Sequence, residues 1–142
     1  MSVKSVQFSV ATHIMGVLGY FHDEEISSST LAESVNADPT FVRKSLSKLS
    51  KAGLVSTTRG KSGSSTLARP AREITLLDIY RASGAPPTFA IHSYPTTRKC
   101  PVSSNLKPCL GNVLSQAQDS FEKSLGNITL ADLVRKIREK KP

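Results

Sequence analysis

The sequence contains no tryptophan and only two cysteines, and its aromatic residues amount to 6% of the chain. A secreted domain held together by disulfides needs more cysteine than this, so we expect a cytoplasmic protein. Acidic residues are scarce too, because 11 Asp and Glu stand against 19 Lys and Arg, a formal net charge of +8. Such an excess favours a polyanionic partner such as nucleic acid, although charge can also serve only to keep a small protein in solution.

Long apolar runs are missing as well. Polar residues at Gln7, Ser9, Thr12 and His13 interrupt the apolar stretch near the start, and no small-residue cleavage site follows it. We therefore expect neither a signal peptide nor a membrane partner. The sequence also has no nucleophile elbow, phosphate loop, zinc-protease helix or paired carboxylates, so we expect no enzyme.

Apolar residues that recur every three or four positions predict a mainly α-helical chain. Thr30 and Glu33 fit a capping box for the second helix, and Asp38 is placed to cap the third, with proline at its first position. Thr75 and Thr129 are placed to cap the fourth and the last helix. The expected helices cover residues 6–21, 31–35, 39–52, 76–84, 106–126 and 129–137.

The third predicted helix has an apolar face and a basic face, and Gly53 ends it. Val42, Leu46 and Leu49 lie on the apolar face. The other face carries six polar or charged residues: Thr40, Arg43, Lys44, Ser47, Lys48 and Lys51.

A β-hairpin with a basic tip follows directly. Residues 54–58 and 66–69 have strand character, and residues 59–65 form a turn that contains glycine, arginine and lysine. Two short helices joined by a tight turn and followed by such a hairpin form a winged helix-turn-helix. The sequence therefore predicts a mainly α fold with a small β-hairpin, that is, a winged helix-turn-helix domain followed by a long dimerisation helix.

The basic helix and the hairpin suggest roles for individual side chains in binding double-stranded DNA. Arg43 can donate two hydrogen bonds to a guanine, Lys44 can reach a base or a phosphate, and short hydroxyls can bond the DNA backbone. Arg59 and Lys61 on the hairpin can reach phosphates or a narrow minor groove. The candidate DNA-binding residues are Thr40, Arg43, Lys44, Ser47, Lys48, Arg59 and Lys61.

Four segments carry a resemblance to a known family. They are residues 51–55 (KAGLV), 59–69 (RGKSGSSTLAR), 73–78 (EITLLD) and 127–133 (NITLADL). The chain resembles, essentially from end to end, the Rrf2 family of bacterial winged-helix regulators, which includes iron–sulfur, nitric-oxide and cysteine-metabolism repressors. The family usually has a second glycine where this chain has Ser64.

The resemblance implies that Thr40, Arg43, Lys44 and Arg59 occupy the family's DNA-contact positions. It also implies a homodimer that pairs through the long helix and represses transcription from a palindromic operator. The apolar spacing of that helix agrees with pairing, because a face that extends beyond a small domain needs cover, and packing on its own domain is the alternative. Pro108 should then lie in the helix's first turn, since a proline further in breaks the hydrogen-bond ladder.

We expect three segments along the chain. Residues 1–84 form the DNA-binding domain, residues 85–101 a sensor-type loop, and residues 102–142 the dimerisation helix with a C-terminal helix. An alternative function is that of a winged-helix adaptor that binds proteins and acts through an enzyme partner.

The sensor-type loop has too few ligands for an iron–sulfur cluster. The resemblance implies that family members with a two-iron cluster bind it through three closely spaced cysteines and a fourth ligand. This chain has only Cys100 and Cys109 in that region, with His92 nearby. We therefore expect no cofactor and no metal, and the spacing of these three residues matches no common zinc site. Three alternatives stay open: Cys100 is a redox-sensing thiol favoured by the preceding Arg98 and Lys99, the loop around His92 and Tyr94 holds a small ligand, or both cysteines only pack.

Overall fold

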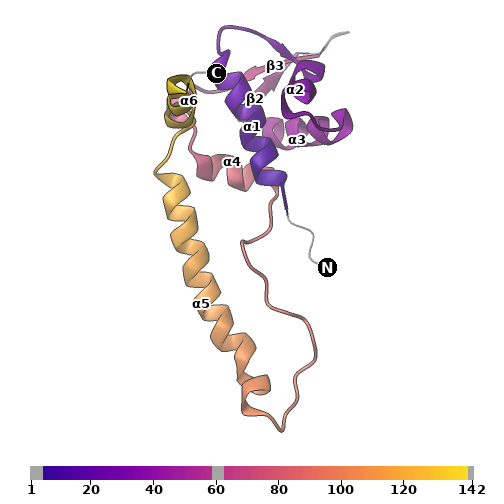
Figure 1. Cartoon of the computed structure of the whole chain (residues 1–142), viewed down its shortest axis with the longest axis vertical. Helices are drawn as coiled ribbons and strands as arrows, with labels where there is room; N and C mark the ends of the chain where they lie inside the picture. The colour runs from indigo at the N-terminus through magenta and orange to yellow at the C-terminus, as the bar shows by residue number, and fades with distance from the viewer. Residues whose placement is uncertain (1–4, 59–62, 141–142) are drawn as a thin grey trace. The chain divides into compact units, whose positions relative to one another are not determined.

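The computed structural model describes residues 5–58 and 63–140 (Figure 1). These residues form two compact units, one of described residues up to Ala85 together with those from Leu125 onward, and one of Pro86–Ser124. The elements are α1 (Gln7–Tyr20), β1 (Ile26–Ser27), α2 (Ser28–Val35), α3 (Pro39–Lys51), β2 (Val55–Thr57), β3 (Ser64–Leu67), the 3-10 turn η1 (Ala71–Glu73), α4 (Leu76–Ser83), α5 (Pro101–Gly126) and α6 (Leu130–Glu139).

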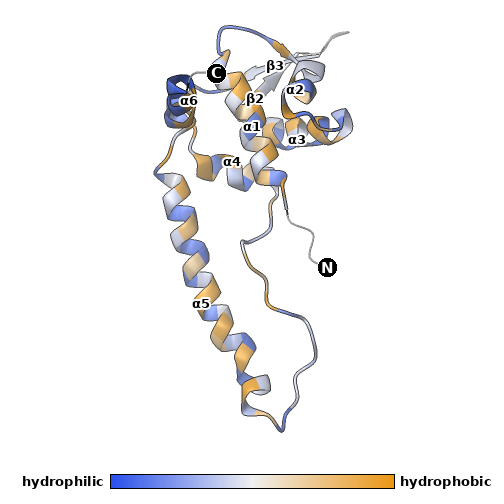
Figure 2. Cartoon of the chain, in the orientation of Figure 1, coloured by the Kyte–Doolittle hydropathy of each residue, from blue (hydrophilic) through white to orange (hydrophobic). Residues whose placement is uncertain are grey.

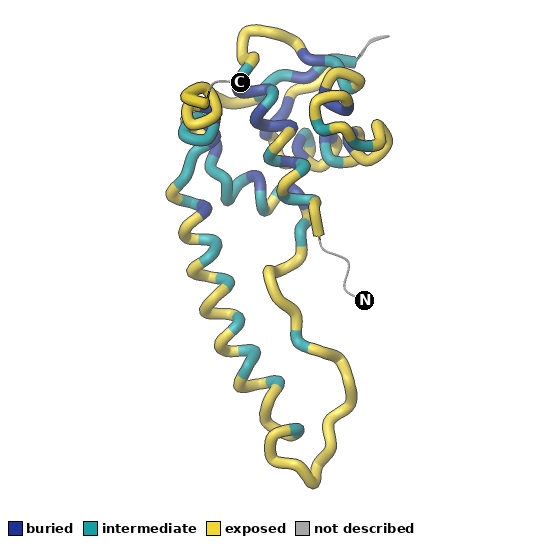
Figure 3. Tube along the Cα trace, viewed as in Figure 1, coloured by how far each residue is buried: buried dark blue, intermediate teal, exposed yellow. Residues whose placement is uncertain are grey.

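The core of the first unit is built around α1. Ile14 and Met15 are fully buried, as the helical period of α1 predicts, and Phe21, expected on the same stripe, is 44% exposed. Helices α3, α4 and α6 all pack on α1. Figure 3 shows the buried positions gathered in this unit, along α1 and the elements around it.

Helices α2 and α3 are joined by a tight turn. Asp38 accepts a 2.7 Å hydrogen bond from the backbone N–H of Thr40, which confirms the predicted cap of α3. The capping box predicted at Thr30 is wrong, because α2 begins earlier and Ser27 caps it by accepting from the Thr30 backbone N–H at 3.1 Å. Ser27 can do so because, as the last residue of β1, it has the extended backbone that a cap requires.

The wing is part of a three-stranded antiparallel sheet and not of a lone hairpin. Strand β3 lies between β1 and β2, pairing Ser64 with Ser27 and Ser65 with Thr57. The two-residue β1 escapes a sequence-based prediction because it is too short to show alternation. The predicted fold class is nevertheless confirmed: a mainly helical winged helix-turn-helix with a long helix near the C-terminus.

Helices α4 and α6 begin at two matching capping boxes that are hydrogen-bonded to each other. Thr75 and Thr129 form an antiparallel bridge, in which the Leu76 N–H donates to the Ile128 carbonyl and the Leu130 N–H donates to the Ile74 carbonyl, at 2.8 and 2.7 Å. The hydroxyl of each threonine accepts from a backbone N–H of its helix, and the threonine's own backbone N–H donates to the carboxylate of Asp78 or Asp132. We call this pair of capped helix starts the clasp; α6 belongs to the same unit as α1–α4.

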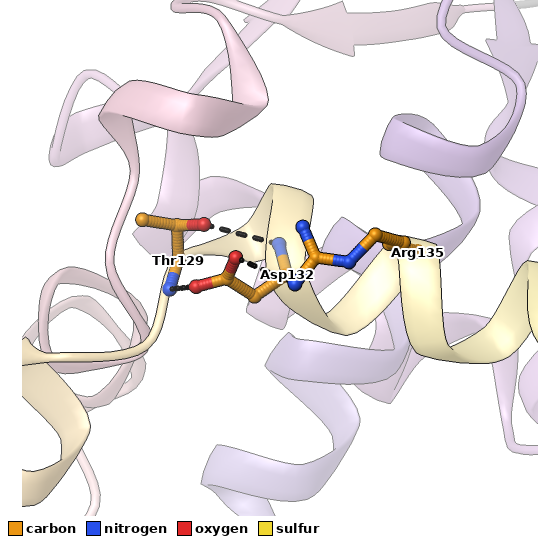
Figure 4. Close-up of polar contacts among 3 residues, drawn as sticks. All are labelled: Thr129, Asp132 and Arg135. Carbon is orange, nitrogen blue, oxygen red and sulfur yellow. Dashed lines mark hydrogen bonds and ion pairs between the residues drawn. The ribbon is translucent and has the colours of Figure 1, made fainter.

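Figure 4 shows the α6 half of the clasp. The Asp132 carboxylate accepts from the Thr129 backbone N–H at 3.0 Å and lies 3.2 Å from the Arg135 guanidinium. Bonding to Thr129 first, and Arg135 second, holds the pKa of the Asp132 carboxyl below its ordinary value. The charged form of Asp132 therefore stabilises the start of α6.

Helix α5 begins earlier than the sequence predicted. It starts at Pro101, so Pro108 lies inside the helix and not in its first turn. The early start is favoured because proline suits the first helical position, and because the Ser104 N–H already donates to the Cys100 carbonyl at 3.0 Å. Because Pro108 has no backbone N–H, α5 lacks one of its backbone hydrogen bonds at this position. In the described part of the chain, no helix is long and apolar enough to cross a membrane.

Candidate nucleic-acid interface

Helix α3 presents a continuous polar face to solvent. Val42 and Leu49 are fully buried on its opposite side, which fixes the rotation of the helix. At about 100° per residue, five exposed side chains then fall within an arc of roughly 100°. They are Thr40, Arg43, Lys44, Ser47 and Lys51.

Lys48 lies at the margin of that face and is directed elsewhere. Its Nζ donates to the backbone carbonyl of Ser83, the last residue of α4, at 3.4 Å. A cation at the C-terminus of a helix stabilises the unpaired carbonyls there. Of the basic residues predicted on α3, Lys48 is therefore the one with a structural partner. Arg43, Lys44 and Lys51 make no side-chain hydrogen bond or ion pair with the residues that the structure describes.

A groove of about 460 Å³ runs between α3 and the sheet. Arg43 and Lys51 lie on its helix side, and hydroxyl groups line much of the remainder. Hydroxyls can donate to phosphate oxygens, so these residues belong to the candidate interface although sequence reasoning missed them. The signal for them is the density of serine and threonine in segments that the fold brings together: Ser28, Ser50, Thr57, Thr58 and Ser64.

The base of the wing is held by polar contacts. The Thr58 N–H donates to the Ser64 carbonyl at 2.9 Å, and the Ser64 hydroxyl donates to the Glu25 carboxylate at 3.2 Å. The hydroxyl at the position where the resemblance implies glycine thus ties the wing to the segment before β1. Arg59 and Lys61, the predicted wing contacts, lie outside the described residues.

The predicted sensing residues all lie in the second unit. Cys100 and Cys109 are exposed free thiols, and the His92 ring accepts from the Tyr94 backbone N–H at 3.2 Å. Cys100 immediately precedes α5 and Cys109 lies within it, nine positions apart in sequence. Along an α-helix, nine residues correspond to a rise of about 13 Å and a rotation of about two and a half turns. The two sulfurs therefore lie on opposite faces of the helix. The two thiols of one chain therefore cannot form a disulfide or share one metal ion.

Among the described residues, no three His, Cys, Asp or Glu side chains are close enough to hold a metal ion. The remaining histidines have other partners, because His13 is 3.1 Å from the Ser34 hydroxyl and His22 is 3.2 Å from the Asp23 carboxylate. A two-iron cluster takes four protein ligands, and the separated thiols do not fit one.

Comparison with known proteins agrees with this architecture. The model of the Rrf2 family, described as iron-dependent transcriptional regulators, matches residues 4–136. YwnA of Bacillus subtilis, provisionally named an HTH-type transcriptional regulator, is 34% identical over 129 residues, 90% of this chain and 94% of that protein.

Two solved structures are similar over nearly their whole length. A regulator from Lactobacillus plantarum, also provisionally named as such, has a TM-score of 0.79 and 28% identity, covering 94% of this chain and 90% of that one. CymR of Staphylococcus aureus has a TM-score of 0.70 and 26% identity, covering 92% and 96%, and has also been solved in an oxidised form. These similar proteins are regulators of transcription and not enzymes.

Proposed function

The chain belongs to the Rrf2 family of DNA-binding transcriptional regulators, and from that premise we propose that it is a cytoplasmic repressor that binds a palindromic operator as a homodimer. The observation that supports the DNA-binding surface most directly is the polar face of α3, which carries Arg43, Lys44 and Lys51; Arg43 and Lys51 also line the hydroxyl-rich groove. Cytoplasmic location follows from the proposed target, since bacterial DNA lies there.

The side chains of this face divide by what they can contact. Arg43 can read a guanine through two hydrogen bonds, which sets sequence preference. Thr40, Lys44, Ser47 and Lys51 suit phosphates or nearby base edges, which set affinity and its salt dependence.

The test is to select bound sequences from a random duplex library and to measure binding by fluorescence anisotropy. We expect a palindromic site, and Arg43→Ala should lower affinity for it by about 1–3 kcal/mol per half-site while leaving random duplex less affected. Equal losses on both duplexes would contradict base reading by Arg43, and no binding to any duplex would favour the adaptor alternative.

The homodimer is supported by the apolar surface of α5. Figure 2 shows apolar residues recurring along this helix, and Val102 and Val113 are 66% and 59% exposed. Of the residues of α5, only Leu125 is buried within the described chain. Apolar residues that repeat along a helix without cover favour a partner helix, and a second copy supplies one with matching length.

Light scattering after gel filtration tests this assignment. We expect twice the 15.3 kDa of one chain, and Val113→Asp should shift the protein toward the mass of one chain because a buried carboxylate is costly. Gln116→Asp, at an exposed polar position of the same helix, is the control for the added negative charge. A wild-type protein at the mass of one chain would rule the homodimer out.

A redox response is a second part of the proposal and is favoured by Cys100. Its thiol is exposed and follows Arg98 and Lys99, an electropositive setting that suits a reactive thiolate. Since Cys109 cannot reach it in the same chain, oxidation would give a sulfenic acid or a bond to another molecule. Operator affinity should change after peroxide in the wild type and in Cys109→Ser but not in Cys100→Ser. A response in all three proteins would exclude Cys100 as the sensor.

A further inference from the structure

Four arginines surround a hollow of about 730 Å³ in the first unit, away from α3. Arg69 and Arg72 come from the segment between the wing and α4, and Arg135 and Arg138 come from α6. Helix α1 separates α6 from α3 in Figure 1, so this hollow does not belong to the candidate DNA interface. We propose that it is a binding site for a small dianion, a phosphate monoester or a dicarboxylate, that carries an apolar group.

Two of the arginines are only partly neutralised. Arg69 Nη2 lies 3.7 Å from the Asp78 carboxylate and Arg135 Nη2 lies 3.2 Å from the Asp132 carboxylate. Each carboxylate is already engaged by the backbone N–H at the start of its own helix. A guanidinium has five N–H donors, so most donors of both arginines stay free for a ligand.

The other two arginines have no carboxylate partner among the described residues. Arg138 stacks over the Tyr20 ring, 4.2 Å from its centroid, and donates to the Tyr20 carbonyl, which fixes its guanidinium in place. Arg72 has no hydrogen bond or ion pair with any residue that the structure describes. Four guanidinium groups against two carboxylates leave two positive charges, which match a dianion.

The apolar residues that line the hollow favour a ligand with an apolar group. Gly19 of α1 and Val134 of α6, both buried, line the hollow together with Leu67 and Ala71. A concave surface with apolar walls and few convergent charges is the usual form of a small-molecule site. Fork-shaped guanidinium groups suit phosphate and carboxylate oxygens, which they bind in pairs.

A DNA backbone would be the other polyanion for such a surface, and the structure favours the small molecule. Arg69 and Arg72 follow the end of β3 that is remote from the wing tip, since the tip joins β2 to the start of β3. The hollow and the groove beside α3 share no lining residue, so a duplex on α3 does not require the hollow. A phosphate chain also gains nothing from an apolar floor.

The test is an amide NMR titration of the full chain with phenyl phosphate and, separately, with phthalate, at constant ionic strength. We expect saturable shifts in residues 67–72 and 131–138 with at least one of the two dianions. Arg72→Ala should weaken binding roughly tenfold, since a charged hydrogen-bond donor is lost, and Arg72→Lys should restore only part of it. Lys123→Ala removes an exposed positive charge from α5, outside both the hollow and the α3 surface; it is the control and should bind as the wild type does.

Three results would overturn the proposal. The first is the absence of saturable shifts in these two segments with both dianions. The second is equal binding by Arg72→Ala and the wild type. The third is a random DNA duplex that shifts these segments while neither dianion does, which would make the hollow a DNA contact. Because the titration contains no operator, its outcome is separate from that of the proposed repressor function.

Discussion

Two lysines one turn apart on α3 give the sharpest test of the proposed DNA surface. Lys51 lies on the exposed polar face, whereas Lys48 Nζ donates to the Ser83 carbonyl 3.4 Å away. We predict that Lys51→Ala changes the salt dependence of DNA binding and that Lys48→Ala does not. Both substitutions remove one positive charge from the same helix, so each is the other's control for net charge.

The magnitude follows from counterion release. Each phosphate contact contributes about −0.9 to the slope of log affinity against log salt concentration. A homodimer carries two copies of Lys51, so the slope should become less steep by about 1.8 in Lys51→Ala. Between about 50 and about 200 mM salt, that difference corresponds to a roughly tenfold smaller loss of affinity than in the wild type. If a single chain binds, the change should be about half as large.

The assay is fluorescence anisotropy with a labelled random-sequence duplex at several salt concentrations, because phosphate contacts do not depend on sequence. Lys48→Ala should keep the wild-type slope and lose less than about 1 kcal/mol of folding stability, through the end of α4. Equal slopes for Lys51→Ala and wild type, or a flatter slope for Lys48→Ala, would refute this assignment of the two side chains.

Three further outcomes are expected from the fold. Asp38→Ala should lower the free energy of unfolding by about 1 kcal/mol in urea denaturation, because α3 loses its cap, and no loss would contradict that role. Leu130→Ala should lower it by about 2–5 kcal/mol, since this side chain is fully buried beside α1, and a smaller loss would mean that α6 is not docked. Asp132→Asn should destabilise the protein at neutral pH. Because the pKa of Asp132 is lowered on folding, its contribution is present above the ordinary value of 3.8 and is lost as the pH falls through the lowered one; thermal melts of variant and wild type should therefore converge in acid, and a difference that persists there would refute the cause.

Local features of the sequence predicted most of the helices and their caps. Asp38 followed by proline marks the start of α3 with its own hydrogen bond, and Thr75 and Thr129 do the same for α4 and α6. Such signals act over three or four residues, which is why they can be read without the fold. Thr30 was misread because Ser27, three residues earlier, also fits the pattern and has the extended backbone that a cap needs.

Non-local pairings could not be predicted in the same way. Strand β1 exists only because β3 lies beside it, and the pairing of Thr75 with Thr129 joins segments more than fifty residues apart. The α3 face follows from its apolar period, but the partner of Lys48 is on α4, and only the fold brings that carbonyl within reach. The arginine hollow likewise draws its side chains from two distant segments.

The clasp has a consequence for variation in chain length. Its two backbone hydrogen bonds join the start of α4 to the start of α6. The two ends of the intervening segment, which contains Pro86–Ser124, are therefore held close together on the first unit. Since the entropy of closing a loop grows only with the logarithm of its length, doubling this excursion costs about 0.6 kcal/mol. A segment of different size or chemistry can therefore be exchanged at the clasp while the first unit keeps its architecture.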